Sequence, residues 1–174
     1  MFMLVLIYGN LGSGKSTLAK KFCKEENFIL IRFDEMMFKY KDRVYSKDDD
    51  FLLGKEDILL VYEDMHKLAL KELKKGKSVV LESLYMKAQR EKARKIAKNI
   101  SVDFKVVEVY CDETKIKKRL TLRKKEDPQT PGFKLYLEYK KLLDVEDDCI
   151  KIDTSSKNVA DCYKQLVQEI KRKE

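Results

Sequence analysis

The sequence predicts an α/β fold in which a parallel β-sheet carries helices on both faces. Two observations predict this class. Short apolar runs typical of buried strands recur along the chain, and helical segments with a 3.6-residue apolar period alternate with them. The first apolar run, residues 1–8, also leads directly into a glycine-rich loop. Right-handed crossovers between such units place the carboxyl ends of the strands, where ligands bind, at one edge of the sheet.

The glycine-rich loop "YGNLGSGKST" spans residues 8–17 and fits the pattern G-x-x-x-x-G-K-[ST]. In this pattern backbone N–H groups surround phosphate oxygens, the lysine contacts the β- and γ-phosphates, and the final hydroxyl ligates Mg²⁺. The apolar run before the loop and the helical period of residues 16–26 after it supply the strand–loop–helix context that the motif requires. We therefore predict a P-loop NTPase fold with a nucleotide site formed by Gly9, Asn10, Leu11, Gly12, Ser13, Gly14, Lys15, Ser16 and Thr17.

The remaining elements follow in chain order. We expect four more strands, at residues 28–33, 77–83, 103–111 and 149–153, which gives a five-stranded parallel sheet. Further helices are expected at residues 51–75, 86–99, 113–125, 133–143 and 157–172. The polar segment 126–132 interrupts two of these helices, and we expect a short lid at about residues 115–135. No repeat or Pro/Gly/Ser-rich linker divides the chain, so a single domain over residues 1–174 is expected.

Charged residues make up 39% of the chain and the net charge is +8. Ordinary domains have about 25% charged residues, and enrichment in Lys and Glu is typical of hyperthermophile proteins. The positive charge permits an anionic partner. The four cysteines lack metal-type spacing, which favours free thiols in a reducing compartment, the cytoplasm. No run reaches the ~20 apolar residues of a membrane span, so no membrane partner is expected. The only histidine, His66, is expected to be an ordinary helix residue.

Two carboxylates are expected at the edge of the sheet that carries the P-loop. Asp34 directly follows the second expected strand, and Glu82 ends the apolar part of the third. A carboxylate at Asp34 could accept the proton of an attacking hydroxyl, although aspartate is also a preferred helix N-cap. Glu82 occupies the place of a Walker B acid. We predict that it holds Mg²⁺ together with Ser16, directly or through the second shell of ligands, and a solvated strand-end acid is the alternative.

Basic residues form three further sets. Arg119 and Arg123 are four residues apart on an expected helix, so both should project from one face toward nucleotide phosphates, unless this face is simply solvated. Residues 36–45 interleave aromatic and basic side chains, which suits a nucleic-acid acceptor or, equally, a helix packed on the core. The third set is expected to form a basic stripe that is solvated or tracks a polyanion: Lys87, Arg90, Arg94 and Lys98.

Taken in order, several motifs resemble those of the small P-loop kinases with a nucleoside-phosphate-kinase-like fold. This group includes polynucleotide 5′-kinases, zeta toxins and ATP-binding kinases of the AAA-domain type. The resemblance rests on "GNLGSGKST", "LIRFDE", "GKSVVLES" followed by "KAQRE", "RLTLR" and "IDTS". It implies ATP and Mg²⁺ as cofactors, Asp34 as the catalytic base, and Arg119 and Arg123 as lid arginines. Two features depart from the pattern: Glu82 replaces a common Asp, and Met36 and Met37 stand where polynucleotide kinases carry an arginine.

These observations predict an ATP-dependent kinase that transfers the γ-phosphate to an acceptor hydroxyl. Lys15, Asp34, Arg119 and Arg123 would be the catalytic residues, and residues 34–75 would form the acceptor region. The acceptor could be a nucleic acid, a nucleotide or a small metabolite. Two alternatives stay open: a regulatory P-loop NTPase that phosphorylates nothing, and a toxin-like kinase acting on a nucleotide-sugar. A GTPase is disfavoured because the sequence has no N-K-x-D motif.

Overall fold

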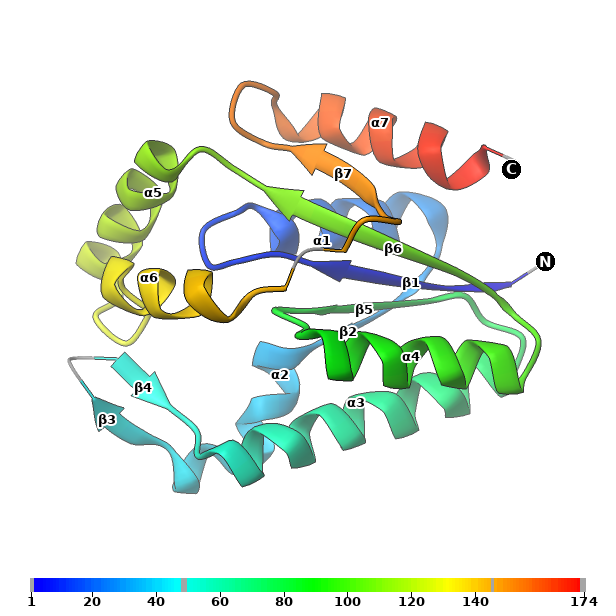
Figure 1. Ribbon diagram of the computed structural model, residues 1–174, viewed down its shortest axis with the longest axis horizontal. Coiled ribbons are helices and arrows are strands. Elements are labelled where there is room, and N and C mark those ends of the chain that lie inside the picture. Colours follow the sequence, from blue (N-terminus) through cyan, green and yellow to red (C-terminus); the bar gives the residue numbers. More distant parts are fainter. Residues whose placement is uncertain (1, 48–49, 145, 173–174) are drawn as a thin grey trace.

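A computed structural model of the chain describes residues 2–47, 50–144 and 146–172, with backbone only for residues 45–47, 50 and 51. Its main sheet has five parallel strands in the order β2-β5-β1-β6-β7. All five strands point toward the same end of the molecule (Figure 1). This confirms the predicted five-stranded parallel sheet. The strands are β1 (Met3–Tyr8), β2 (Ile29–Arg32), β5 (Val79–Ser83), β6 (Asp103–Tyr110) and β7 (Ile150–Asp153).

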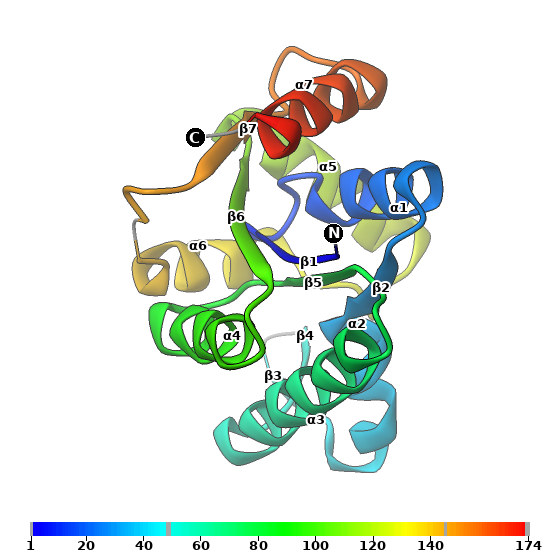
Figure 2. The ribbon, with the colours of Figure 1, turned by 90° about the vertical axis from the view of Figure 1, so that its right-hand side faces the viewer.

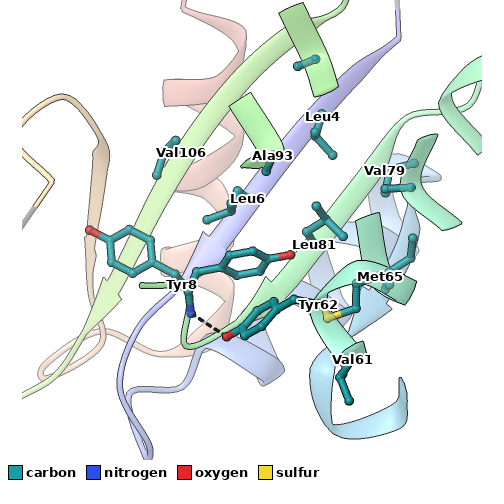
Figure 3. Packing of buried hydrophobic residues seen from close by; sticks show 14 of the residues in the cluster. Leu4, Leu6, Tyr8, Val61, Tyr62, Met65, Val79, Leu81, Ala93 and Val106 are labelled. Carbon is teal, nitrogen blue, oxygen red and sulfur yellow. Dashed lines mark hydrogen bonds between the residues drawn. The ribbon is translucent and has the colours of Figure 1, made fainter. Parts of the chain in front are cut away.

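Helices cover both faces of the sheet. The helices α1 (Lys15–Glu26) and α7 (Val159–Lys171) pack on one face, and α3 (Lys55–Lys74) and α4 (Lys87–Asn99) pack on the other (Figure 2). Side chains of β1 alternate between the two layers. Leu4 and Leu6 face α3 and α4, as Figure 3 shows, whereas Val5 and Ile7 face α1 and α7. Because both faces of β1 are buried, its sequence is apolar without alternation.

The structure corrects the prediction for residues 51–75. The helix there, α3, begins only at Lys55, and the residues before it form the antiparallel hairpin β3 (Tyr45–Lys47) and β4 (Asp50–Leu52). Gly54 is the N-cap of α3 with an extended backbone (φ −63°, ψ 158°). Glu56 and Asp57 then lie in the first turn, where the helix dipole favours negative charge. Phe51 and Leu52 fit the apolar pattern of the predicted helix, but they belong to the strand β4.

Further short elements gather at the end of the molecule where the five strands finish (Figure 1). The chain leaves β2 into α2 (Phe33–Met37) and the 3₁₀-helix η1 (Phe38–Arg43), and it leaves β6 into α5 (Glu113–Glu126) and α6 (Phe133–Leu142). The segment predicted as a lid thus contains most of α5 and the start of α6. Ile116 and Leu120 of α5 and Tyr136 of α6 form a small buried cluster, against which Leu11 of the P-loop packs.

The prediction of a basic stripe on the surface of α4 is wrong for Arg90, the second of its four residues. Arg90 is fully buried, and its guanidinium lies 4.7 Å from the ring centroid of Tyr8. Arg90 Nε donates to Glu146 at 2.9 Å and Nη1 donates to the carbonyl of Tyr85 at 2.8 Å. The burial of Arg90 is possible because Glu146, far away in sequence, supplies the counter-charge. Lys87 and Lys98 remain exposed, but the four cations do not share one surface.

Three smaller expectations can be compared with the structure. All four cysteines are free thiols, as predicted. His66 lies within α3, also as predicted, but its ring is buried and 3.4 Å from the hydroxyl of Tyr85. Burial and the nearby charge of Lys92 lower the pKa of His66 to about 4. Within the described parts of the chain, no helix combines the length and the apolar character that a membrane crossing requires.

Candidate functional site

The P-loop connects β1 to α1 through backbone conformations that glycine favours. Gly12 has φ +73°, and Gly14, the N-cap of α1, has φ +93°. No side chain caps the first turn of α1, so its N–H groups are directed toward the loop, as in an anion-binding helix terminus. A Cβ atom on Gly9 would lie 2.1 Å from the carbonyl oxygen of Val109, so only glycine fits there. The loop is therefore a preformed cradle for phosphate oxygens.

Two residues from distant segments hold the outer side of the P-loop. Thr154 follows β7, and its hydroxyl donates to the carbonyl of Ser13 at 2.6 Å. Arg119 of α5 donates to the carbonyl of Gly12 at 3.0 Å and to the carbonyl of Thr154 at 3.1 Å. These bonds engage loop carbonyls rather than N–H groups. They therefore occupy none of the loop's N–H groups, of which Leu11 N–H donates to Asn10 Oδ1 at 2.7 Å and Ser13 N–H to the Asn10 carbonyl at 3.3 Å.

A buried carboxylate lies beside the P-loop lysine and serine. Glu82 is 2% exposed, accepts a hydrogen bond from the Ser16 hydroxyl at 3.2 Å, and lies 3.8 Å from Lys15 Nζ. Mg²⁺ takes oxygen ligands and usually keeps several waters and phosphate oxygens. The described residues contain no group of three His, Cys, Asp or Glu side chains that could hold a metal ion by themselves. A serine hydroxyl next to one buried carboxylate fits Mg²⁺ that takes its other ligands from phosphate and water.

Arg32 is a site residue that the sequence analysis did not single out. It ends β2 directly beside Glu82 of β5, and its Nε donates to Glu82 at 2.8 Å. The same guanidinium contacts Glu35 at 2.9 Å and Asp34 at 3.3 Å. Burial disfavours the charge on Arg32, but hydrogen bonds to Glu82 and Glu35 outweigh it, so the pKa of Arg32 is raised. The sequence did contain one indication of this role, because Arg32 is the only charged residue in the otherwise apolar strand β2.

Asp34 lies in the first turn of α2, at the edge of the sheet where it was expected. The N-cap of this helix is Arg32, so the capping alternative for Asp34 is not what the structure contains. The Asp34 side chain is 71% exposed and has one ion-pair partner, Arg32, among the residues described. Asp34 and Lys15 line the same cavity. An exposed carboxylate in this position could accept a proton from a molecule bound in the cavity.

Three of the hollows that border the P-loop are linked by shared lining residues. The central hollow, about 560 Å³, is lined by Gly12, Lys15, Ser16, Asp34 and Arg123, with Phe38 and Lys41 at its side. The α7 hollow, about 270 Å³, shares Arg123 with it and is further lined by Gly14, Thr17, Arg119, Lys157 and Val159. The apolar hollow, about 280 Å³, shares Lys15 and Asp34 with the central hollow. The remaining lining residues of the apolar hollow include Glu82, Ser83, Phe33, Ile58, Leu84, Met86 and Leu135.

The two lid arginines occupy different surroundings. The guanidinium of Arg119 is hydrogen-bonded to the P-loop and to Thr154, as described above, and of these three hollows it lines the α7 hollow alone. Arg123 lies one turn further along α5 and borders both the α7 hollow and the central hollow. Both side chains line the α7 hollow, and their expected contact with nucleotide phosphates stays a prediction. Arg123 alone extends to the central one.

The aromatic and basic segment 36–45 packs largely onto α3. Lys39 contacts Asp64 at 3.1 Å, Arg43 contacts Asp57 at 2.6 Å, and the Tyr40 hydroxyl donates to Asp64 at 3.4 Å. Phe38, 73% exposed, and Lys41 instead border the central hollow. The side chain of Tyr45, the last residue of the segment, lies outside the described part. The structure therefore favours packing on α3 for most of this segment.

The strand–loop–helix at the sheet edge, with Lys15, Ser16 and Glu82 around it, defines a P-loop protein of the nucleotide-binding class. Residues 4–136 match the sequence model of the AAA domain family, and the chain belongs to this family. No curated protein matches the sequence.

Solved structures with the same fold include several kinases. A candidate kinase from Chloroflexus aurantiacus j-10-fl superimposes with a TM-score of 0.74 at 14% identity, covering 96% of this chain and 97% of the other. A gluconokinase from Sinorhizobium meliloti 1021 gives a TM-score of 0.68 at 15% identity, with coverages of 95% and 90%. The APS kinase of Mycobacterium tuberculosis, in complex with AMPPNP and APS, gives 0.71 at 13% identity, with coverages of 98% and 98%. At these identities the likeness establishes the fold, which is that of P-loop kinases.

Proposed function

We propose that the protein is an ATP-dependent phosphotransferase in which Asp34 activates an acceptor hydroxyl. The observation that carries the proposal is the meeting of two hollows at Lys15 and Asp34. Phosphoryl transfer requires a phosphate cradle, charge stabilisation and a base beside the acceptor. A donor phosphate in the central hollow and an acceptor in the apolar hollow would meet between a cation and a carboxylate.

The nucleotide is proposed to lie along the α7 hollow and the central hollow. Its base and sugar would lie near Arg119 and Lys157, and its phosphates would follow the P-loop to Lys15. Arg123, which borders both hollows, would contact the phosphates, while Arg119 would act mainly by positioning the loop. Mg²⁺ held at Ser16, with Glu82 nearby, would neutralise charge on the β- and γ-phosphates.

In the proposed reaction the acceptor hydroxyl gives its proton to the Asp34 carboxylate as its oxygen bonds to the γ-phosphorus. The bond from the γ-phosphorus to the bridging oxygen of ADP breaks, and ADP leaves with that oxygen. Lys15 would stabilise the charge that develops on the phosphoryl oxygens. Arg32 donates hydrogen bonds to both Glu82 and Asp34. It would therefore fix the position of the proposed base, Asp34, relative to Glu82, the carboxylate near the metal.

The test compares Asp34→Asn with a matched neighbour, Glu35→Gln. Both carboxylates contact Arg32, but only Asp34 lines the hollows. Transfer of label from γ-labelled ATP with Mg²⁺ should fall about 10²–10⁴-fold in Asp34→Asn and stay near the wild-type rate in Glu35→Gln. Calorimetric ATP binding should be retained in both.

Full transfer by Asp34→Asn would refute its role as the base. Release of free phosphate alone, with no labelled acceptor in a broad panel, would instead support a regulatory NTPase. Label transfer to a nucleotide-sugar, together with growth arrest on expression in a foreign host, would support the toxin-like alternative.

A further inference from the structure

We infer that the acceptor is an uncharged alcohol whose hydroxyl is attached to an apolar or aromatic body, an inference that rests on the proposed function. The apolar hollow carries this inference. It adjoins the central hollow at Lys15 and Asp34 and extends between α2, the start of α3, the end of β5 and α6. These elements lie together at the carboxyl end of the sheet in Figure 1.

The polar groups of the apolar hollow are gathered at one end. Among its described lining residues, Lys15, Asp34, Glu82 and Ser83 are the charged or small polar ones, and all belong to the sheet edge and the P-loop. The hydroxyl of Tyr62 is already bonded to Ser83 Oγ at 2.9 Å and to the N–H of Tyr85 at 3.3 Å, the second bond being the dashed line in Figure 3. The charged and small polar partners for a ligand hydroxyl thus lie at the end where the phosphoryl group would arrive, and the other tyrosine of the lining is Tyr139 of α6.

Apart from Tyr139, the rest of the described wall consists mainly of hydrocarbon side chains and aromatic rings. Leu53 and Leu135 are each 5% exposed, and Phe33 packs against Tyr62 with ring centroids 5.1 Å apart. Ile58, Leu84 and Met86 complete this wall. An apolar ligand gains from leaving water in such a cavity, whereas each extra hydroxyl of a polyol would lose its water hydrogen bonds without replacement.

Charge excludes anionic acceptors from the same cavity. Lys15 is the one Lys, Arg or His side chain among its described lining residues, and the proposed function assigns Lys15 to the nucleotide phosphates. The Asp34 carboxylate, which lines the cavity and is 71% exposed, would repel a carboxylate or phosphate on the acceptor. The volume of about 280 Å³ lies at the small end of ligand pockets, so it suits a single ring or short chain rather than a polynucleotide.

The test uses the full chain and a panel of named acceptors. The panel contains 3-phenylpropan-1-ol and hexan-1-ol as uncharged apolar alcohols, against gluconate, glycerol and a 5′-hydroxyl oligoribonucleotide. Saturation-transfer NMR without nucleotide measures binding, and label transfer from γ-labelled ATP with Mg²⁺ measures reaction. We expect saturable binding and transfer with the two apolar alcohols and neither with the other three.

Matched variants tie this specificity to the cavity. Ile58→Gln should raise KM for 3-phenylpropan-1-ol about tenfold, because it places an amide in the apolar wall. Leu59→Gln changes the next residue of α3, which is 47% exposed and does not line the hollow, and should leave KM unchanged. A second pair on α6 uses exposed positions, where a substitution is less disruptive to folding. Leu142→Gln, at a residue that lines the hollow and is 59% exposed, should raise KM about threefold, and Leu137→Gln should not.

The failure of this inference differs from the failure of the proposed function. Transfer to gluconate, glycerol or RNA with none to the apolar alcohols would overturn the acceptor class while leaving the kinase intact. An unchanged KM in both folded cavity variants would overturn it too. Saturable alcohol binding that Ile58→Gln weakens, without transfer to any acceptor, would support the cavity's specificity and refute the phosphotransferase.

Discussion

Replacing Arg32 by methionine should destabilise the fold by about 3 kcal/mol, because it leaves Glu82 buried without its guanidinium. The Arg32 side chain is 11% exposed and Glu82 is 2% exposed, and their N···O distance is 2.8 Å. Removing one member of a buried ion pair typically costs about 3–5 kcal/mol. The contacts of Arg32 with the exposed Asp34 and Glu35 add at most about 1 kcal/mol each. The lower end of the range applies because Ser16 and Lys15 still face Glu82.

The assay is urea unfolding at pH 7 followed by circular dichroism, in a double-mutant cycle. Arg32→Met, Glu82→Gln and the double variant should show a coupling energy of about 2 kcal/mol, because the double variant no longer buries an unpaired charge. Arg43→Met is the control. Its ion pair with Asp57 is shorter, 2.6 Å, but Arg43 is 59% exposed, so its loss should cost much less than the loss of Arg32. Equal losses in Arg32→Met and Arg43→Met, or additive effects in the cycle, would refute the argument from burial.

Two further predictions concern the P-loop and the buried histidine. Gly12→Ala should cost about 2 kcal/mol and weaken ATP binding, because φ is +73° and its Cβ would lie 3.1 Å from Ile116. Gly76→Ala, with φ +75° but no atom within 4 Å, should cost about 1 kcal/mol and leave ATP binding unchanged in the same calorimetric titration. His66 has a pKa of about 4 in the fold, below its ordinary value, so it stabilises the fold above about pH 6.5 and this contribution is lost as pH falls toward 4. Between pH 7 and pH 5 the free energy of unfolding in urea should fall by about 2 kcal/mol more in the wild type than in His66→Gln. Equal decreases would contradict the conclusion that the buried ring of His66 is neutral in the fold.

The parallel sheet and the P-loop were predictable because both depend on local sequence. A strand buried on two faces must be apolar at every position, and a phosphate-binding turn needs glycine at positions set by its own backbone angles. The hairpin β3–β4 was not predicted, because its local sequence is compatible with more than one structure. Leu52 continues an apolar pattern that suits a helix or a strand, and Gly54, where the backbone is extended, decides between them.

The sequence also placed Asp34 and Glu82 at the right edge of the sheet, because parallel strands bring their carboxyl ends together. It could not show that Arg32 joins them, since that depends on the pairing of β2 with β5. Arg90 was misjudged for the same kind of reason. Its helical spacing suggested a surface, whereas Glu146 and the ring of Tyr8 make a buried position for its charge.

By itself, then, the sequence determined the fold class, the phosphate-binding loop and the order along the chain of the five strands of the main sheet, because these follow from periodicity and from short-range backbone constraints. Only the tertiary structure decided which polar residues meet and what lies beyond them. The Arg32–Glu82 pair, the bonds of Thr154 and Arg119 to the P-loop, and the apolar hollow all join segments that are far apart in the chain. The physical reason is that a cavity and a buried ion pair are properties of packed surfaces, whose partners no local pattern specifies.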